Sequence, residues 1–454
     1  MELNKCLEIY CNDDNHSERE WIIDVLFREL LCIDYKLHFI RTDNYEICYE
    51  GKKLKISDCF FRYFSNPLEY LSNKNFPKNV SSSTLRLKEK DFPLVVLYGK
   101  NTLEYLEDGI MYGADMFASA FFMLSRWEEY CIEEKDQYGT CDESKLLSIK
   151  YSFFNRPIVN EYATILKELL YNYLEYPIPD KKRKGNIYVT YDVDGLFFSW
   201  KRNLKNTIRT LGGDLLKRRN ISLFFSRLHF IINNVGKDLY DSFEEIERYT
   251  KGLSPLFFFK MQSTDEKGAT YHWKDDRVTL LIDKLVRENG RIGLHTSEFA
   301  YNDDKLLNLE ISRLQSLLFS HSFQYNRNHT LLYDLNQMEF LSRYGIKTDS
   351  SFGFHYHNGF RCGICQEYPM YNFLQRRRMS LNQLPFCIKD NGSFYLDKSI
   401  ETMWENIIGI LNIVKQYNGD IVLLWHTNKL NTFEFRPYKE MHFKLISYLS
   451  QMCI

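Results

Sequence analysis

The hydrophobic pattern at the start of the chain predicts a mixture of helices and strands. Apolar residues recur at helical spacing in 17–33, 116–124 and 158–174. Polar and apolar residues alternate in 36–60, as they do in half-buried strands, and the continuous apolar run 93–98 predicts a buried strand. This order of elements indicates an α+β unit.

The second half of the chain has a different and more regular pattern. Short apolar runs alternate with longer segments of helical periodicity, and this order predicts a parallel sheet or barrel. The predicted strands are 187–191, 256–260, 292–295, 345–348 and 421–426, and the predicted helices are 243–251, 279–288, 305–320, 335–344 and 400–417. In such folds the active site lies at the carboxyl ends of the strands.

The segment 177–185 is the clearest domain boundary in the sequence. It contains two prolines, which block helix continuation, and a run of four basic residues that is typical of a solvated linker. We therefore predict two domains, an α+β accessory domain over 1–180 and a second domain of alternating strands and helices over 186–454. A chain of 454 residues also exceeds the usual size of a single core.

Composition narrows the class of protein. The 59 basic and 60 acidic residues give a net charge of −1, which argues against a nucleic-acid partner. The 11 cysteines are scattered and odd in number, as is typical of a reducing compartment. We see no signal-peptide pattern and no apolar run long enough to span a bilayer, so we expect a cytoplasmic protein. The sequence does not predict an oligomeric state.

Two carboxylates follow the first predicted strand of the second half. Asp192 and Asp194 are two residues apart, so their side chains point to the same side of a strand. Adjacent acids are costly unless a positive charge lies near them, and a divalent metal or an arginine would supply it. A solvated acidic turn is the other interpretation of these residues, because aspartate is common in turns.

Histidines occupy equivalent positions on other predicted strands. His295 and His426 each end an apolar run, so both should reach the sheet edge at which the carboxylates lie. Histidine and aspartate are ligands for Zn²⁺ and similar cations. A third protein ligand is needed, and the candidates are His329, His355 and His357.

These residues carry a resemblance to a known family, the polysaccharide deacetylases (NodB homology, carbohydrate esterase family 4). The chain is most similar to a bacterial subgroup whose first motif reads T-H-D-V-D and which has an N-terminal accessory domain. The segments that carry the resemblance are 190–194 (TYDVD), 293–297 (GLHTS), 327–329 (RNH), 359–363 (GFRCG), 424–427 (LWHT) and, in the accessory domain, 121–130 (FFMLSRWEEY).

The resemblance implies a deformed (β/α) barrel and a metal-dependent hydrolase that removes acetyl groups from a carbohydrate, either a polysaccharide or a glycan precursor. It implies that Asp192 is the general base and that Asp194 and His295 bind the metal, most simply Zn²⁺. It further implies that His426 is the general acid and that Arg361 holds Asp192 ionised.

The chain departs from the wider family at one point. That family has a second histidine three or four residues after the first, whereas His295 is followed only by Thr-Ser-Glu-Phe-Ala. Either His329 completes the site, as we expect, or two ligands and water hold the metal, or no metal binds. The rival functions are an inactive relative that acts in glycan binding or assembly, and a hydrolase of another C–N bond.

Overall fold

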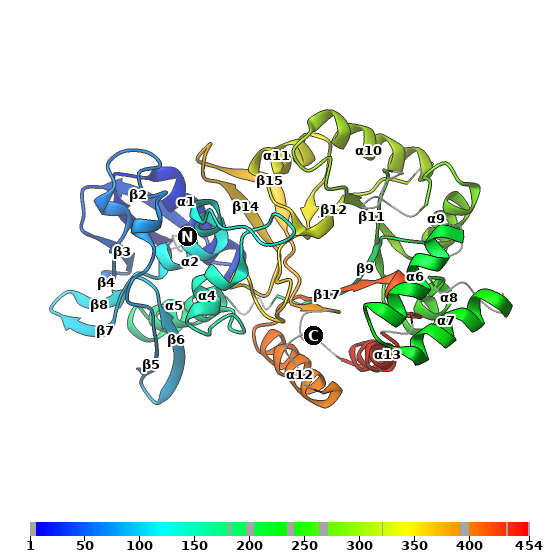
Figure 1. Cartoon of the computed structure of the whole chain (residues 1–454). Coiled ribbons are helices and arrows are strands. Elements are labelled where there is room, and N and C mark those ends of the chain that lie inside the picture. The colour runs from blue at the N-terminus through cyan, green and yellow to red at the C-terminus, as the bar shows by residue number, and fades with distance from the viewer. Residues whose placement is uncertain are drawn as a thin grey trace.

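The computed structural model describes residues 6–179, 183–196, 204–233, 240–262, 271–319, 321–390, 399–432 and 435–452. Asp180, Lys181 and Lys182 of the predicted boundary and residue 320, the predicted end of one helix, lie outside the described residues. The described chain forms two large sheets, one from each half of the sequence (Figure 1).

The first half builds a six-stranded sheet in the order β2-β1-β3-β4-β8-β7 beside a separate β5–β6 hairpin. The strands are β1 (Leu7–Asn12), β2 (Tyr35–Ile40), β3 (Asn44–Tyr49), β4 (Lys52–Ser57), β5 (Ser81–Leu87), β6 (Lys90–Val96), β7 (Gly99–Leu106) and β8 (Gly109–Ala114). The helices are α1 (His16–Asp24), continued by the π-helical η1 (Val25–Leu30), then α2 (Met116–Ser125), α3 (Trp127–Cys131), α4 (Leu147–Lys150) and α5 (Ile158–Tyr173). The predicted mixture of helices and strands is confirmed.

Local sequence explains the most buried of these helices. Every residue of α2 is buried, and none of them is charged. Asp115 caps the helix, because its carboxylate accepts a hydrogen bond of 2.9 Å from the backbone N–H of Ala118. The helix packs between the six-stranded sheet and the second half of the chain, where Phe121 contacts Tyr371.

The second half builds a nine-stranded sheet in the order β14-β15-β13-β12-β11-β10-β9-β17-β16. Its strands are β9 (Ile187–Val193), β10 (Leu256–Phe259), β11 (Arg291–Thr296), β12 (Tyr325–Asn328), β13 (Thr348–Asp349), β14 (Tyr368–Asn372), β15 (Arg377–Gln383), β16 (Ile388–Lys389) and β17 (Ile421–His426). Its helices are α6 (Leu204–Leu216), α7 (Ile221–Asn233), α8 (Phe243–Tyr249), α9 (Asp276–Arg287), α10 (Asp304–Leu317), α11 (Leu335–Arg343), α12 (Ile400–Gln416) and α13 (Arg436–Ser450). All neighbouring strands are parallel except β14 and β15.

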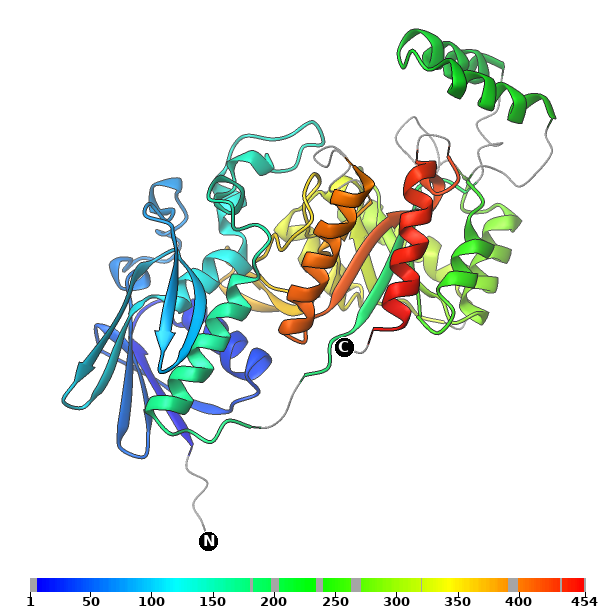
Figure 2. The same cartoon turned by 90° about the horizontal axis from the view of Figure 1, so that it is seen from below.

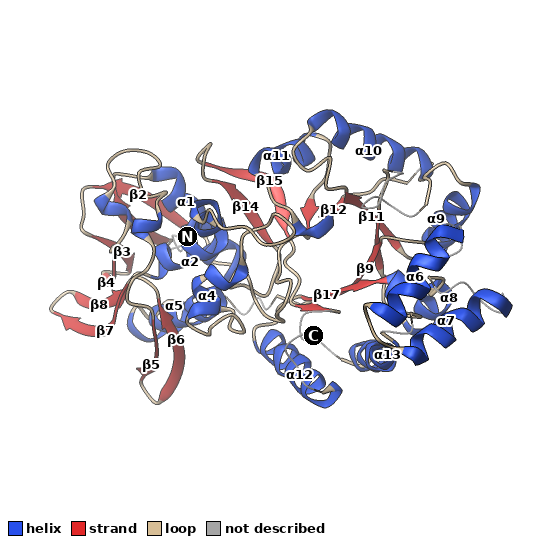
Figure 3. Ribbon diagram, viewed as in Figure 1, coloured by secondary structure: helices blue, strands red, loops and turns tan. Residues whose placement is uncertain are grey.

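The predicted alternation of strands and helices is confirmed, and the fold is mixed α/β (Figure 3). The deformed barrel is not confirmed, because the described strands do not pair β14 with β16 at the two ends of the sheet. The pattern also missed β12, whose last three residues Asn326, Arg327 and Asn328 are fully buried although they are polar. A search for apolar runs cannot find a strand of this kind.

The two halves are packed together through β14 and β15, which lie between the first sheet and the rest of the second (Figure 1). The indole N–H of Trp21 donates to the carbonyl of Pro369 at 3.3 Å, and the Trp21 and Tyr371 rings are 4.9 Å apart. Arg376 forms a bidentate pair with the buried Glu18, both contacts being 2.9 Å. The two-domain organisation stays a prediction, since these contacts do not show whether either half folds alone.

Candidate functional site

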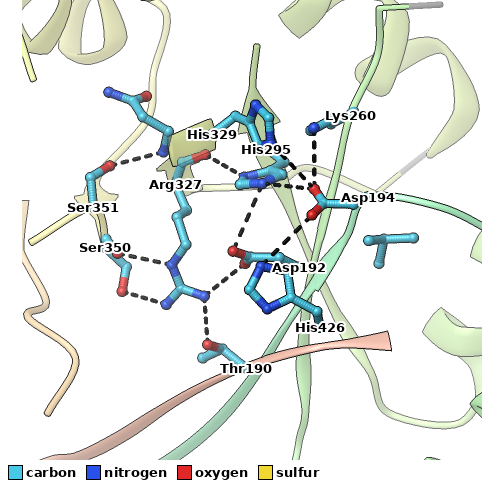
Figure 4. Close-up of polar contacts among 12 residues, drawn as sticks. Thr190, Asp192, Asp194, Lys260, His295, Arg327, His329, Ser350, Ser351 and His426 are labelled. Carbon is cyan, nitrogen blue, oxygen red and sulfur yellow. Dashed lines mark hydrogen bonds and ion pairs between the residues drawn. The ribbon is translucent and has the colours of Figure 1, made fainter. Parts of the chain in front are cut away.

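Strand register places three functional side chains in one row. Phe259 of β10 pairs with the last residue of β9 on one side and with the residue before His295 on the other. The residues that come next, Asp194, Lys260 and His295, therefore lie side by side across three parallel strands. Figure 4 shows these side chains pointing toward one another.

A possible metal-binding triad is formed by Asp194, His295 and His329. Oδ1 of Asp194 lies 3.3 Å from Nε2 of His295 and 3.9 Å from Nε2 of His329, and the three ligand atoms lie within 4.8 Å of one another. His295 therefore reaches the sheet edge at which Asp194 lies, and the two side chains face one another. His355 and His357, the other candidates for a third ligand, are not part of this group.

The donor atoms of the triad fit a cation. Within the described chain, Oδ1 of Asp194 and Nε2 of His295 are buried and have no hydrogen-bond partner. Nδ1 of His295 lies 2.9 Å from the carbonyl oxygen of Arg327, and Nδ1 of His329 lies 2.8 Å from Oε2 of Glu298. These contacts assign the ring proton of each histidine to Nδ1 and leave both Nε2 lone pairs facing Asp194.

The electrostatics of the triad favour metal binding as well. Burial lowers the pKa of the His329 imidazole, which keeps the ring neutral near neutral pH. Burial alone would raise the pKa of the Asp194 carboxyl, but Lys260, His295 and His329 together hold it well below its ordinary value. A neutral imidazole and an ionised carboxylate are the forms that bind Zn²⁺.

Lys260 is an unexpected member of the site. Its Nζ lies 3.2 Å from Oδ1 of Asp194, the same oxygen that faces the two histidines, and its side chain is almost fully buried. Tyr271 fixes the backbone there, because its hydroxyl accepts from the N–H of Lys260 at 2.9 Å and donates to the carbonyl of Val193 at 3.1 Å. The protein thus provides a cation of its own beside Asp194.

Asp192 is buried and paired with an arginine. Its Oδ1 accepts a hydrogen bond of 2.9 Å from Arg327, which also donates to Thr190 at 2.7 Å. Burial alone would raise the pKa of the Asp192 carboxyl, but Arg327, followed by His295 and His426, holds it below the ordinary value. The carboxylate is therefore ionised and fixed in orientation.

The prediction that Arg361 holds Asp192 is wrong. The three guanidinium nitrogens of Arg361 contact Glu129 at 2.9 and 3.1 Å, Glu143 at 2.9 Å and the carbonyl of Gly353 at 2.9 Å. The position beside Asp192 belongs to Arg327, which β12 brings next to His295 by direct register. The resemblance implied the correct residue type but the wrong segment of the chain.

His426 lies on the other side of the carboxylates. β17 pairs His426 with Asp192, and Nε2 of His426 lies 3.7 Å from Oδ2 of Asp194. Its Nδ1 lies 2.7 Å from Oδ2 of Asp390, which Lys429 also contacts at 3.2 Å. Burial alone would raise the pKa of the Asp390 carboxyl, but His426 and Lys429 hold it well below its ordinary value.

Asp390 therefore orients the imidazole of His426 with Nε2 toward the site. Asp390 and Glu298 are single carboxylates in unremarkable sequence, so sequence reasoning had no signal by which to find either of them. His355 is buried, and the ring of Tyr138 stacks on it with a centroid separation of 4.9 Å.

Comparison with known proteins gives few matches. A family model described as a family of unknown function (DUF7033) matches residues 7–175, and no curated protein matches the chain. A Bordetella bronchiseptica structure, described as a proposed polysaccharide deacetylase involved in O-antigen biosynthesis, is 12% identical over 58% of this chain and 81% of its own, with a TM-score of 0.29.

A Mycobacterium smegmatis structure, also described as a proposed polysaccharide deacetylase, is 14% identical over 60% of this chain and 86% of its own, with a TM-score of 0.37. At these identities and TM-scores, neither likeness assigns an activity to this chain. Among the described helices, none is both long and apolar enough to cross a membrane.

Proposed function

We propose that the protein is a metal-dependent carbohydrate deacetylase that hydrolyses N-acetyl or O-acetyl groups of a polysaccharide or a glycan precursor. The observation that carries this proposal is the convergence of open donor atoms on Asp194, His295 and His329 beside the ionised Asp192. The resemblance of the sequence motifs to the deacetylase family supports it. The proposal includes a deformed (β/α) barrel as the form of the catalytic domain and an accessory role for residues 1–180.

Asp194, His295 and His329 would hold the metal, with Zn²⁺ the simplest choice for one carboxylate and two imidazoles. A divalent cation bound there supplies a Lewis acid that polarises an acetyl oxygen and acidifies water. Asp192 would take the proton from the attacking water, because its carboxylate is ionised and Arg327 fixes its orientation.

His426 would return a proton to the departing amine or alkoxide. Its Nδ1 is committed to Asp390, so Nε2 is the atom that can carry the proton toward the substrate. The Asp390 carboxylate would also stabilise the protonated imidazole of His426 until the leaving group takes the proton. Base and acid would thus come from neighbouring strands, β9 and β17.

One observation favours a second candidate function, an inactive relative that binds glycans without hydrolysing them. The Lys260 ammonium lies 3.2 Å from Asp194 and already gives this carboxylate a counter-charge. Because Lys260 already neutralises the charge of Asp194, the folded protein does not need a metal at this site for stability. The open Nε2 of His295 is the observation that argues against this reading.

Acetate release decides between the two functions. The full-length protein, freed of metal by a chelator and reloaded with Zn²⁺, Mn²⁺ or Co²⁺, would be assayed on N-acetylated and O-acetylated oligosaccharides. We expect Asp192→Asn to lose roughly a hundredfold or more in rate while its metal affinity is unchanged, because it removes a base and not a ligand.

Asp283→Asn is the matched control, since Asp283 pairs with Arg287 on an exposed face of α9 at 2.8 Å. It should leave the rate unchanged. If the metal-loaded wild type releases no acetate from either class of substrate but still binds them, the glycan-binding function is the correct one.

A further inference from the structure

The helices α6 and α7 form a pair that stands away from the rest of the chain (Figure 2). They pack against one another and follow β9, the strand whose carboxyl end carries Asp192 and Asp194. The pair therefore comes from the edge of the sheet at which the candidate site lies. Nothing in the proposed reaction uses it.

Large apolar side chains of this pair are exposed to solvent. Leu216 is 84% exposed and Ile232 is 68% exposed. The other exposed members are Ile208, Leu215, Ile221 and Phe225. Single exposed apolar residues are ordinary on a protein surface, but several on one helical pair indicate a surface that another partner covers.

The charge of the pair distinguishes between kinds of partner. Residues 204–233 contain six lysines and arginines and a single acidic residue, although the whole chain has a net charge of −1. That acid, Asp214, is buried and pairs with Arg218 at 2.9 Å and with Arg227 at 3.5 Å. The solvent-facing surface of the pair is therefore apolar and basic, with no exposed carboxylate among its described residues.

We propose that α6 and α7 dock the protein on the surface of an anionic phospholipid bilayer. Apolar side chains would enter the boundary between headgroups and acyl chains, and the lysines and arginines would face anionic headgroups. Exposed apolar residues with a strong basic excess are the composition that this partner selects. A purely apolar protein partner would not account for the charge.

The consequence for the substrate rests on the proposed function. Because the pair follows β9, docking would hold the candidate site close to the bilayer, where a glycan carried on a membrane lipid is presented. The docking itself does not depend on catalysis, so it can be tested without an activity assay.

Sedimentation with vesicles tests the docking on the full-length protein. One set of vesicles contains phosphatidylcholine alone, and the other contains about 30% phosphatidylglycerol. We expect binding to the anionic vesicles only, and weaker binding as salt is raised, because salt screens the basic residues. Leu216→Asp should weaken the partition onto vesicles roughly tenfold or more.

Lys217→Glu should weaken partition by about tenfold too, because it reverses one exposed charge near the lipid surface. The matched controls are Leu280→Asp on α9, where Leu280 is 66% exposed, and Lys305→Glu on α10, and neither should change binding. Circular dichroism would confirm that each variant is folded.

Equal binding to both kinds of vesicle, or equal losses from the control variants, would overturn the proposal. So would the absence of binding to the anionic vesicles. A dimer in sedimentation velocity that Leu216→Asp dissociates would then show that a second copy covers the apolar face. If the metal-loaded wild type binds anionic vesicles but releases no acetate, the proposed reaction is contradicted and the proposed docking is supported.

Discussion

Two of the regions that hold buried charges, the candidate site and a cluster formed by Arg126, Glu129, Glu143 and Arg361, differ in how their carboxylates are paired. In the arginine cluster, each carboxylate oxygen of Glu129 and Glu143 accepts a hydrogen bond from an arginine or from the backbone. In the candidate site, an oxygen of Asp194 has no such bond within the described chain.

This difference separates a structural role from a functional one. Burial alone would raise the pKa of the Glu143 carboxyl, but His357 and Arg361 lower it to about 2, so the cluster holds its charges in fixed pairs. A buried acceptor without a hydrogen bond costs free energy, and a cation bound at Asp194 would offset that cost. Arg361 therefore supports the fold, whereas Asp194 is available to bind.

Arg361→Met should give the largest effect on stability. The change leaves Glu129 and Glu143 buried without their shared counter-charge, which we expect to lower the free energy of unfolding by about 3–5 kcal/mol. Urea unfolding would measure the loss, and calorimetric metal binding by the folded protein should be unchanged.

Arg287→Met is the matched control for this variant. Arg287 forms an exposed pair with Asp283, so its loss should change stability by less than about 1 kcal/mol. If Arg361→Met instead removed metal binding and left stability intact, the distinction between the two regions would be wrong.

His329→Ala tests the candidate site. It removes one of three ligands, so we expect metal affinity to fall by roughly a hundredfold or more, with partial recovery of acetate release in excess metal. Calorimetry with Zn²⁺ measures the affinity. Glu298→Gln keeps an acceptor for Nδ1 of His329 and should have a smaller effect. A His329→Ala protein with full metal content would exclude His329 as a ligand.

His355, whose backbone N–H donates to Glu143 of the arginine cluster, should make the protein sensitive to acid. Burial, helped by Lys389, lowers the pKa of the His355 imidazole to about 3, against an ordinary value near 6.5. Between these values the unfolded chain binds the proton and the folded chain does not, so stability falls as pH decreases below about 6.5. The contribution of His355 to this loss at pH 5 is about 2 kcal/mol.

His355→Gln removes this titrating group. Urea unfolding of the wild type and the variant, compared from pH 7.5 to pH 5, should show a flatter dependence on pH in the variant. Parallel curves would show that His355 does not contribute to the acid sensitivity.

Sequence reasoning found the parts of the site that lie on apolar strands. Asp192, Asp194, His295 and His426 all end such runs, and periodicity was enough to place them at one edge of a parallel sheet. The strand that carries Arg327 was not predicted, because β12 is buried through hydrogen bonds of its own polar side chains.

Register was the other piece of information that the sequence lacked. Lys260 was predicted as the last residue of a strand, but its position between Asp194 and His295 depends on how β9, β10 and β11 align. Pairing between strands far apart in the sequence is set by packing of the whole sheet, which local patterns do not contain. The deformed barrel was implied by the resemblance and is not confirmed, since no pairing between β14 and β16 closes the sheet of described strands.

Lys260→Met tests whether the Lys260 ammonium competes with a metal for Asp194. A cation bound by Asp194, His295 and His329 has to share Oδ1 of Asp194 with the Lys260 ammonium at 3.2 Å. Like charges at such a distance repel, so removing the ammonium should tighten metal binding by roughly tenfold. Calorimetry with Zn²⁺ and Co²⁺ on the metal-free protein measures the change, and methionine keeps most of the volume of the buried side chain.

Lys284→Met is the matched control, because Lys284 pairs with Glu247 at 2.9 Å on the half-exposed face of α9 and its loss removes the same charge. It should leave metal affinity unchanged. Weaker binding by Lys260→Met would mean that the ammonium orients Asp194 for the metal and does not compete with it. If the wild type binds no metal but Lys260→Met does, the Lys260 ammonium occupies the place of the metal beside Asp194. The candidate site of the wild type would then be a fixed ion pair, like those of the arginine cluster.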